Sequence, residues 1–199
     1  KMSTRQGKVV LLSDFLDEAT ARAAEKVEEQ CKDLPADERR AIAAHVAVAA
    51  IRFAILRVNA NKNVIFDWDS SLSFTGDTGP YVQYSCARIS SILRKLGFTA
   101  GDTPPKEFPV ETDAEWALLS KLATFPECVA QSTNARSVAP VAQFALETAR
   151  VFTTFYHECP VRDAPTDPQR IARAHVCAAT RRVLQNALDL LGIAALERM

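Results

Sequence analysis

The chain has 199 residues, 48% of them hydrophobic, with 24 Lys and Arg balanced by 24 Asp and Glu. This length and hydrophobic content can bury a proper core, whereas no apolar run approaches the ~20 residues that span a bilayer. With no net charge, any affinity for nucleic acid must come from a local patch, and five scattered cysteines favour reduced thiols in a cytoplasmic protein without a membrane partner.

The first residues, KMSTRQGK, are basic and polar and lead into a short apolar run. They predict a flexible loop in which Lys1, Ser3 and Arg5 could contact a polyphosphate, although short basic termini usually bind nothing specific. Because Lys1 precedes Met2, the sequence is expected to be a piece of a longer protein.

Two helices are predicted next, over about 13–31 with Ser13 as the N-cap, and over 36–57. A turn over 59–63 follows. Apolar residues then alternate with Asp67 and Asp69, which predicts a short half-buried strand or extended segment near 64–69 with two solvated carboxylates.

A helix beginning at Pro80 offers two faces. One is an apolar stripe formed by Val82, Cys86, Ile89, Leu93 and Leu96. The other carries Tyr81, Tyr84, Arg88, Ser91 and Lys95. Aromatic rings beside cations suit single-stranded RNA, because bases stack on the rings while the cations meet phosphates. Half-buried tyrosines beside solvated charges are an equally ordinary alternative.

The rest of the chain predicts helices, which makes the fold mostly α, a helical bundle. They are expected over 113–124, from Phe125 onward, over 138–158, and from a Thr166/Gln169 capping box to Leu191, with Gly192 as the stop. In the first of these, Trp116, Leu118, Leu119 and Leu122 form the apolar set. Arg170, Arg173 and Arg181 make either a basic stripe or a solvated face of the last one.

Histidine and cysteine occur together near the C-terminal third, as His157 with Cys159 and His175 with Cys177. Sulfur and imidazole ligands suit zinc, but no paired CxxC spacing is present. A third residue that would orient a Cys–His nucleophile cannot be identified either. We therefore expect neither a metal site nor a catalytic thiol.

Four stretches resemble signatures of arginyl-tRNA synthetases, which are class I aminoacyl-tRNA synthetases. FDWDSSLSFTGDTGPYVQYSCARISSILRK, residues 66–95, is similar to the opening of their anticodon-binding domain. FTTFYHECPV resembles FNxFYHxCPV, with Thr153 for Asn, and LGIAALERM resembles LGIxxPERM, with Ala195 for Pro and Met199 as the expected natural end. KMSTR resembles the KMSKS loop, with Thr4 in place of the second lysine.

The resemblance implies three parts: a KMSKS-like loop and the end of the catalytic domain (1–12), connecting helices (13–63), and a helical anticodon-binding domain of the class I synthetase type (64–199). It implies that Lys1, Ser3 and Arg5 belong to the ATP-facing loop. For tRNA binding it indicates Tyr81, Gln83, Tyr84, Arg88, Tyr156 and Met199.

By the same resemblance, the parent enzyme uses ATP and Mg²⁺ to join arginine to tRNA-Arg. Its Rossmann core, with the HIGH-type motif and arginine pocket, would precede Lys1 and be the partner of this piece. Alone, the piece is expected to be inactive, to bind no cofactor and no DNA, and to hold the tRNA anticodon region. The alternative is a stand-alone helical RNA-binding or protein-interaction module, for which an ATP-facing loop would have no use.

Overall fold

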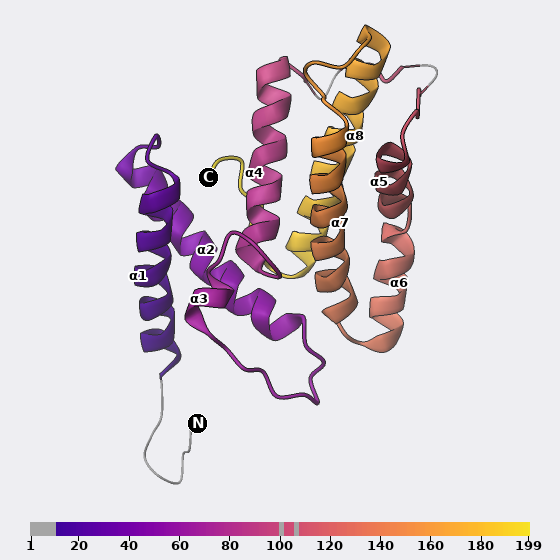
Figure 1. Cartoon of the computed structure of the whole chain (residues 1–199). Helices are drawn as coiled ribbons and strands as arrows, with labels where there is room; N and C mark the ends of the chain where they lie inside the picture. Colours follow the sequence, from indigo (N-terminus) through magenta and orange to yellow (C-terminus); the bar gives the residue numbers. More distant parts are fainter. Residues whose placement is uncertain (1–10, 100–101, 106–107) are drawn as a thin grey trace.

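The computed structural model describes residues 11–99, 102–105 and 108–199, and these fold into eight helices without a β-strand (Figure 1). The mostly α fold predicted from the sequence is confirmed. In chain order the helices are α1 (Leu12–Gln30), α2 (Ala36–Leu56), α3 (Trp68–Ser71), α4 (Gly79–Leu96), α5 (Asp113–Ala123), α6 (Phe125–Ala135), α7 (Ala139–Glu158) and α8 (Asp167–Leu190).

Two groups of buried side chains hold these helices together. One lies between α1, α2 and the segment around Leu72, and includes Ala19, Ala23, Val27, Val46 and Leu72. The other lies among α4, α5, α7 and α8, and includes Val82, Ile89, Leu118, Phe152 and Leu184. Helix α2 serves both: Ala49 and Phe53 belong to the second group, whereas Ala50 and Ile51 belong to the first.

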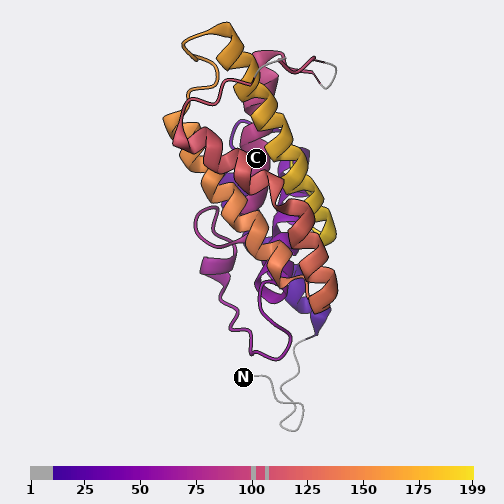
Figure 2. The ribbon, with the colours of Figure 1, turned by 90° about the vertical axis from the view of Figure 1, so that its right-hand side faces the viewer.

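The helices are therefore arranged as an α1–α2 pair beside a bundle of α4, α7 and α8, with α5 and α6 covering α7 on the far side (Figure 2). Within the described residues, no helix has the length and apolar character that crossing a membrane requires.

Helix α4 has a defined start and end. Thr78 caps it by accepting a hydrogen bond from the Tyr81 N–H at 3.0 Å, and Gly97, in the left-handed conformation at φ 66°, ends it. At Gly79 an added Cβ would lie 2.5 Å from the Ala49 carbonyl oxygen and 2.8 Å from Phe53 Cβ. Only glycine lets α4 approach α2 this closely. Val82, Cys86 and Ile89 are buried, as their spacing predicts.

The segment over 64–69 is extended up to Asp67 and then helical, so the strand alternative is wrong while the extended one is confirmed. The carboxylate of Asp67 accepts the Ser70 N–H at 2.9 Å and caps α3. Phe66 and Trp68 are half-buried because both rings pack on Phe15 of α1, with centroids 5.2 and 4.8 Å away.

Three local expectations are wrong. Helix α1 begins at Leu12, so Ser13 lies inside it and donates to the Asp14 carboxylate instead of capping. Trp116 is 66% exposed because it projects from the outer side of α5. Thr166 caps α8, but the Gln169 amide donates to the Glu111 carboxylate rather than closing a capping box.

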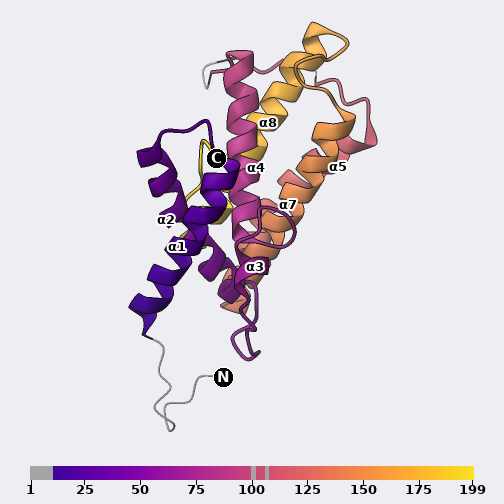
Figure 3. The same cartoon turned by 60° about the vertical axis from the view of Figure 1, so that its left-hand side comes forward.

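The C-terminal segment, residues 192–199, turns back from α8 and ends beside α4, which Figures 1 and 3 show from two sides. Gly192, at φ 65°, ends α8 as predicted, with its N–H donating to the Asp189 carbonyl at 2.9 Å. The guanidinium of Arg52 donates to the Gly192 carbonyl at 2.7 Å, which ties the segment to α2.

Candidate nucleic-acid interface

Four of the residues that the resemblance implies for tRNA binding lie on one surface, formed by α4, the end of α7 and the chain terminus. A hollow of about 330 Å³, the Met199 hollow, is lined by Leu34, Tyr84, Arg88, Arg94, Arg198 and Met199 among others. A second hollow of about 460 Å³, the Tyr156 hollow, is lined by Arg88, Lys95, Tyr156, Pro160, Arg162 and Asp163 among others. Because Arg88 and Ser91 line both, the two hollows are adjacent.

The guanidinium of Arg88 lies over the ring of Tyr156, 4.2 Å from its centroid. This cation–π contact fixes the long arginine side chain at the boundary between the hollows. It also covers one face of Tyr156, so the flat guanidinium itself becomes the surface on which a base could stack. Tyr84 is 40% exposed one turn away and offers a ring without such a cover.

Two predicted contact residues point elsewhere. Tyr81 is half-buried, and its hydroxyl shares a hydrogen bond with Thr153 Oγ1 at 3.0 Å, which joins α4 to α7. Gln83 is fully buried, and its amide donates to the Ala194 carbonyl at 2.8 Å. Direct tRNA contact by Gln83 is therefore wrong for this structure, and its side chain instead fixes the C-terminal segment that carries Met199.

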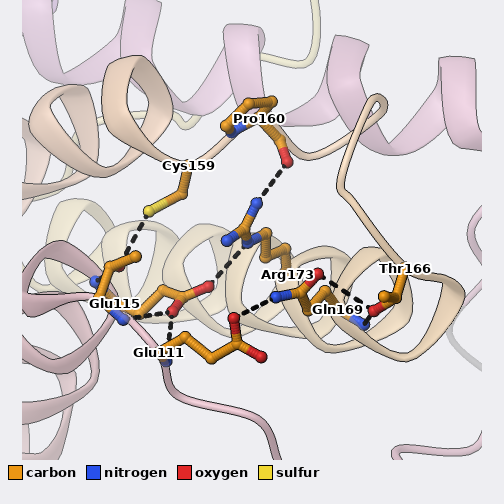
Figure 4. Close-up of polar contacts among 8 residues, drawn as sticks. Glu111, Glu115, Cys159, Pro160, Thr166, Gln169 and Arg173 are labelled. Carbon is orange, nitrogen blue, oxygen red and sulfur yellow. Dashed lines mark hydrogen bonds and ion pairs between the residues drawn. The ribbon is translucent and has the colours of Figure 1, made fainter.

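Neither alternative for the three arginines of α8, a basic stripe or a solvated face, is correct, because the three have different surroundings. Arg173 is buried and donates to the Glu115 carboxylate at 2.7 Å and to the Pro160 carbonyl at 2.9 Å (Figure 4). Arg170 pairs with Asp167 on its own helix. Arg181 alone pairs with a residue of the Met199 hollow, Glu197. Spacing along a helix could not reveal the acidic partner that α5 supplies to Arg173.

Glu115 completes a capping box with Thr112 at the start of α5. Burial would raise the pKa of this carboxyl, but hydrogen bonds from the Glu111 and Thr112 N–H groups and from Arg173 outweigh burial and lower it. The carboxylate therefore stays charged opposite Arg173. Since Arg173 also holds Pro160, which lines the Tyr156 hollow, this buried network fixes one wall of the candidate interface.

A third hollow of about 340 Å³, the Arg182 hollow, opens between α4 and α8 and includes Arg94, Phe98, Arg181, Arg182 and Glu197 in its lining. It adjoins the Met199 hollow, because Arg94 and Glu197 line both. We call the three hollows together the basic band. Their lining carries seven Lys and Arg and only two acidic side chains, in a chain of zero net charge. In a chain without net charge, any affinity for nucleic acid must come from a local patch, and this band is a candidate for it.

Lys1, Ser3 and Arg5 lie outside the described residues. The five cysteines are free, and burial raises the pKa of Cys86 and Cys177 to about 12. Cys159 is buried, its sulfur 3.2 Å from the Thr112 hydroxyl. In the described part of the chain, no group of three or more His, Cys, Asp or Glu side chains is placed to hold a metal ion.

The chain is similar to known proteins both in sequence and in structure. Residues 82–199 match the DALR anticodon binding domain, and residues 1–68 match the catalytic domain of class I tRNA synthetases (R). Arginine–tRNA ligases of Aliivibrio fischeri and Methanopyrus kandleri are 39% and 41% identical, over 98% and 100% of this chain. The arginyl-tRNA synthetase structure from Thermus thermophilus superposes with a TM-score of 0.87 over 96% of the chain, at 37% identity.

The two domain matches together define a class I tRNA synthetase with a DALR anticodon binding domain. The chain belongs to the arginyl-tRNA synthetase family, as its sequence signatures indicated. It spans about a third of the length of these relatives, 34% and 33% of the two ligases and 32% of the Thermus chain.

Proposed function

We propose that the basic band binds the anticodon region of tRNA-Arg. The observation that carries this proposal is the juxtaposition of Tyr84, Arg88 and Met199 around one hollow, inside the stretch that matches an anticodon binding domain. Tyr84 and the Arg88 guanidinium supply stacking surfaces, Met199 supplies an adaptable apolar contact, and the neighbouring arginines meet the phosphates.

We infer that the chain is part of an arginine–tRNA ligase that activates arginine with ATP and Mg²⁺ and charges tRNA-Arg in the cytoplasm. The match of residues 1–68 to a catalytic domain supports this inference, and the free thiols fit a reducing compartment. In this proposal Lys1, Ser3 and Arg5 face ATP, and the rest of the catalytic domain is the partner of this chain. We also propose that the chain has three parts, residues 1–12, 13–63 and 64–199. The ligand in this proposal is RNA and not DNA.

Binding of a labelled tRNA-Arg anticodon stem-loop to the 199-residue chain, measured by fluorescence anisotropy, tests the proposal. The stem-loop should bind more tightly than the same stem with a substituted loop, and more tightly than a DNA hairpin of the same sequence. Equal affinity for all three would overturn it. Such a result would favour the alternative of a helical interaction module.

A further inference from the structure

We propose that the Arg182 hollow is a second phosphate site for the same RNA, occupied in the free protein by the carboxylate of Glu197. This inference rests on the proposed function and deepens it, because it assigns a phosphate contact and a competing carboxylate to one hollow of the basic band. Tyr84, Arg88, Tyr156 and Met199 lie in the other two hollows, whereas this hollow lies on the α8 side of α4.

Two arginines contact Glu197, and a third lines the same hollow. Arg181 donates to its carboxylate at 2.6 Å, and Arg94 donates to its backbone carbonyl at 3.2 Å. Arg182 lines the same hollow, is exposed, and makes no ion pair with any described residue. The lining of the hollow thus has three arginines and one carboxylate. A phosphate diester, which is an anion with several acceptor oxygens, could take the place of that carboxylate.

Arg181 is held ready for such a ligand. Its Nε donates to the Ser90 hydroxyl at 2.8 Å, and its side chain is only 29% exposed, so the guanidinium keeps its position when its partner changes. The Glu197 side chain, by contrast, is 75% exposed and can turn into solvent at little cost. The mobile partner in this ion pair is therefore the carboxylate.

The position of the hollow favours RNA over a separate small anion as its ligand. Because Arg94 lines both this hollow and the Met199 hollow, an RNA strand that stacks on Tyr84 would have Arg181 and Arg182 within its further course. One strand crossing the band would displace Glu197 as it arrives. In the free protein, Glu197 therefore neutralises part of the positive charge of the hollow. In the complex, that charge would be available to the RNA.

Two substitutions with opposite expected effects test the proposal. Glu197→Gln keeps an oxygen that can accept from Arg181 but removes the competing charge, so the stem-loop should bind about two- to fivefold more tightly. Arg182→Gln should bind about two- to fivefold less tightly, and its logarithmic salt slope should be smaller by about 0.7–0.9. Glu127→Gln and Lys62→Gln, exposed substitutions on α6 and on the α2–α3 loop, serve as charge-matched controls.

The direction of the affinity change distinguishes a phosphate site from a purely structural role of Glu197. If Glu197 only fastens the C-terminal segment, Glu197→Gln will weaken binding, and the proposal is wrong. An unchanged salt slope for Arg182→Gln would also overturn it, although the wild-type chain would still select the stem-loop and the proposed function would stand. Sodium tripolyphosphate separates the sources of phosphate: micromolar binding that Arg182→Gln abolishes without affecting RNA affinity would assign the hollow to a free polyphosphate instead.

Discussion

The guanidinium of Arg173 and the carboxylate of Glu115 meet 2.7 Å apart in the interior, with side chains only 6% and 4% exposed. The pair joins α8 to α5, and through the Pro160 carbonyl it reaches the Tyr156 hollow. An interior pair of this kind is costly to break from one side, because the remaining charge loses its partner without regaining water.

We expect Glu115→Leu to lower the free energy of unfolding by about 3–5 kcal/mol, because it leaves Arg173 buried with only the Pro160 carbonyl. Arg173→Met should cost less, since Glu115 keeps two backbone N–H donors. Urea unfolding followed by circular dichroism measures both. The double variant should recover part of the loss, and a double variant as unstable as the sum of the two would contradict the pairing.

The lowered pKa of Glu115 predicts a particular pH dependence. Because its pKa is lower in the folded state than the ordinary value of about 4.3, its contribution to stability is full above that value and is lost as pH falls through the folded pKa. Urea midpoints measured from pH 6 down to pH 3 should therefore fall less steeply in Glu115→Gln than in the wild type. Glu127→Gln, an exposed substitution on α6, is the control for the loss of one carboxylate.

Replacing Tyr84 by Ala should weaken binding of the anticodon stem-loop by about 1–3 kcal/mol, because an exposed stacking ring is lost while the core is untouched. Arg88→Ala should weaken binding too, and should reduce the salt slope by about one charge. Anisotropy titrations over 50–200 mM salt measure both effects. A folded Tyr84→Ala variant that binds like the wild type would remove Tyr84 from the interface.

Gln83→Leu tests whether Gln83 acts by positioning the C-terminal segment and not by touching RNA itself. It removes the hydrogen bond to the Ala194 carbonyl within the buried interior, so the C-terminal segment should loosen while α4 stays formed. We expect faster amide exchange over 194–199 by mass spectrometry, together with weaker RNA binding. Gln83→Glu, whose carboxylate cannot donate unless protonated, should resemble Gln83→Leu at pH 8 and come closer to the wild type at low pH. Wild-type exchange in Gln83→Leu would contradict this role.

Gly79→Ala should lower stability by about 1–3 kcal/mol, because the new Cβ meets the Ala49 carbonyl and Phe53 Cβ, neither of which is a flexible side-chain end. Gly76→Ala has free space around it, and its cost comes from φ 82° alone. The thermal unfolding midpoints of the two variants compare the cost of a steric clash, in Gly79→Ala, with the cost of backbone strain, in Gly76→Ala. A Gly79→Ala midpoint equal to that of the wild type would show that α2 and α4 can separate.

Helix order and the buried stripe of α4 were predictable because apolar spacing and capping residues act locally. Thr112–Glu115 has the T-x-x-E pattern of a capping box and could have been recognised too. The roles of Gln83, Tyr81 and Arg173 could not, because each depends on a partner supplied by a distant segment: Ala194, Thr153 and Glu115. A single sequence does not show whether a polar residue near a surface stripe contacts a ligand or another helix of the same chain.

Helix α2 places Ala49 and Phe53 in one core and Ala50 and Ile51 in the other. Removing α2 from either core would expose apolar residues of both, so we expect the two cores to lose stability together. The α1–α2 pair lies entirely within the catalytic-domain match, and α2 joins it to the bundle that matches the anticodon binding domain, so we expect both parts to unfold in one cooperative step. We therefore expect a displacement of α2 at Ala49 and Phe53 to move the beginning of α4, where Gly79 packs directly against both residues.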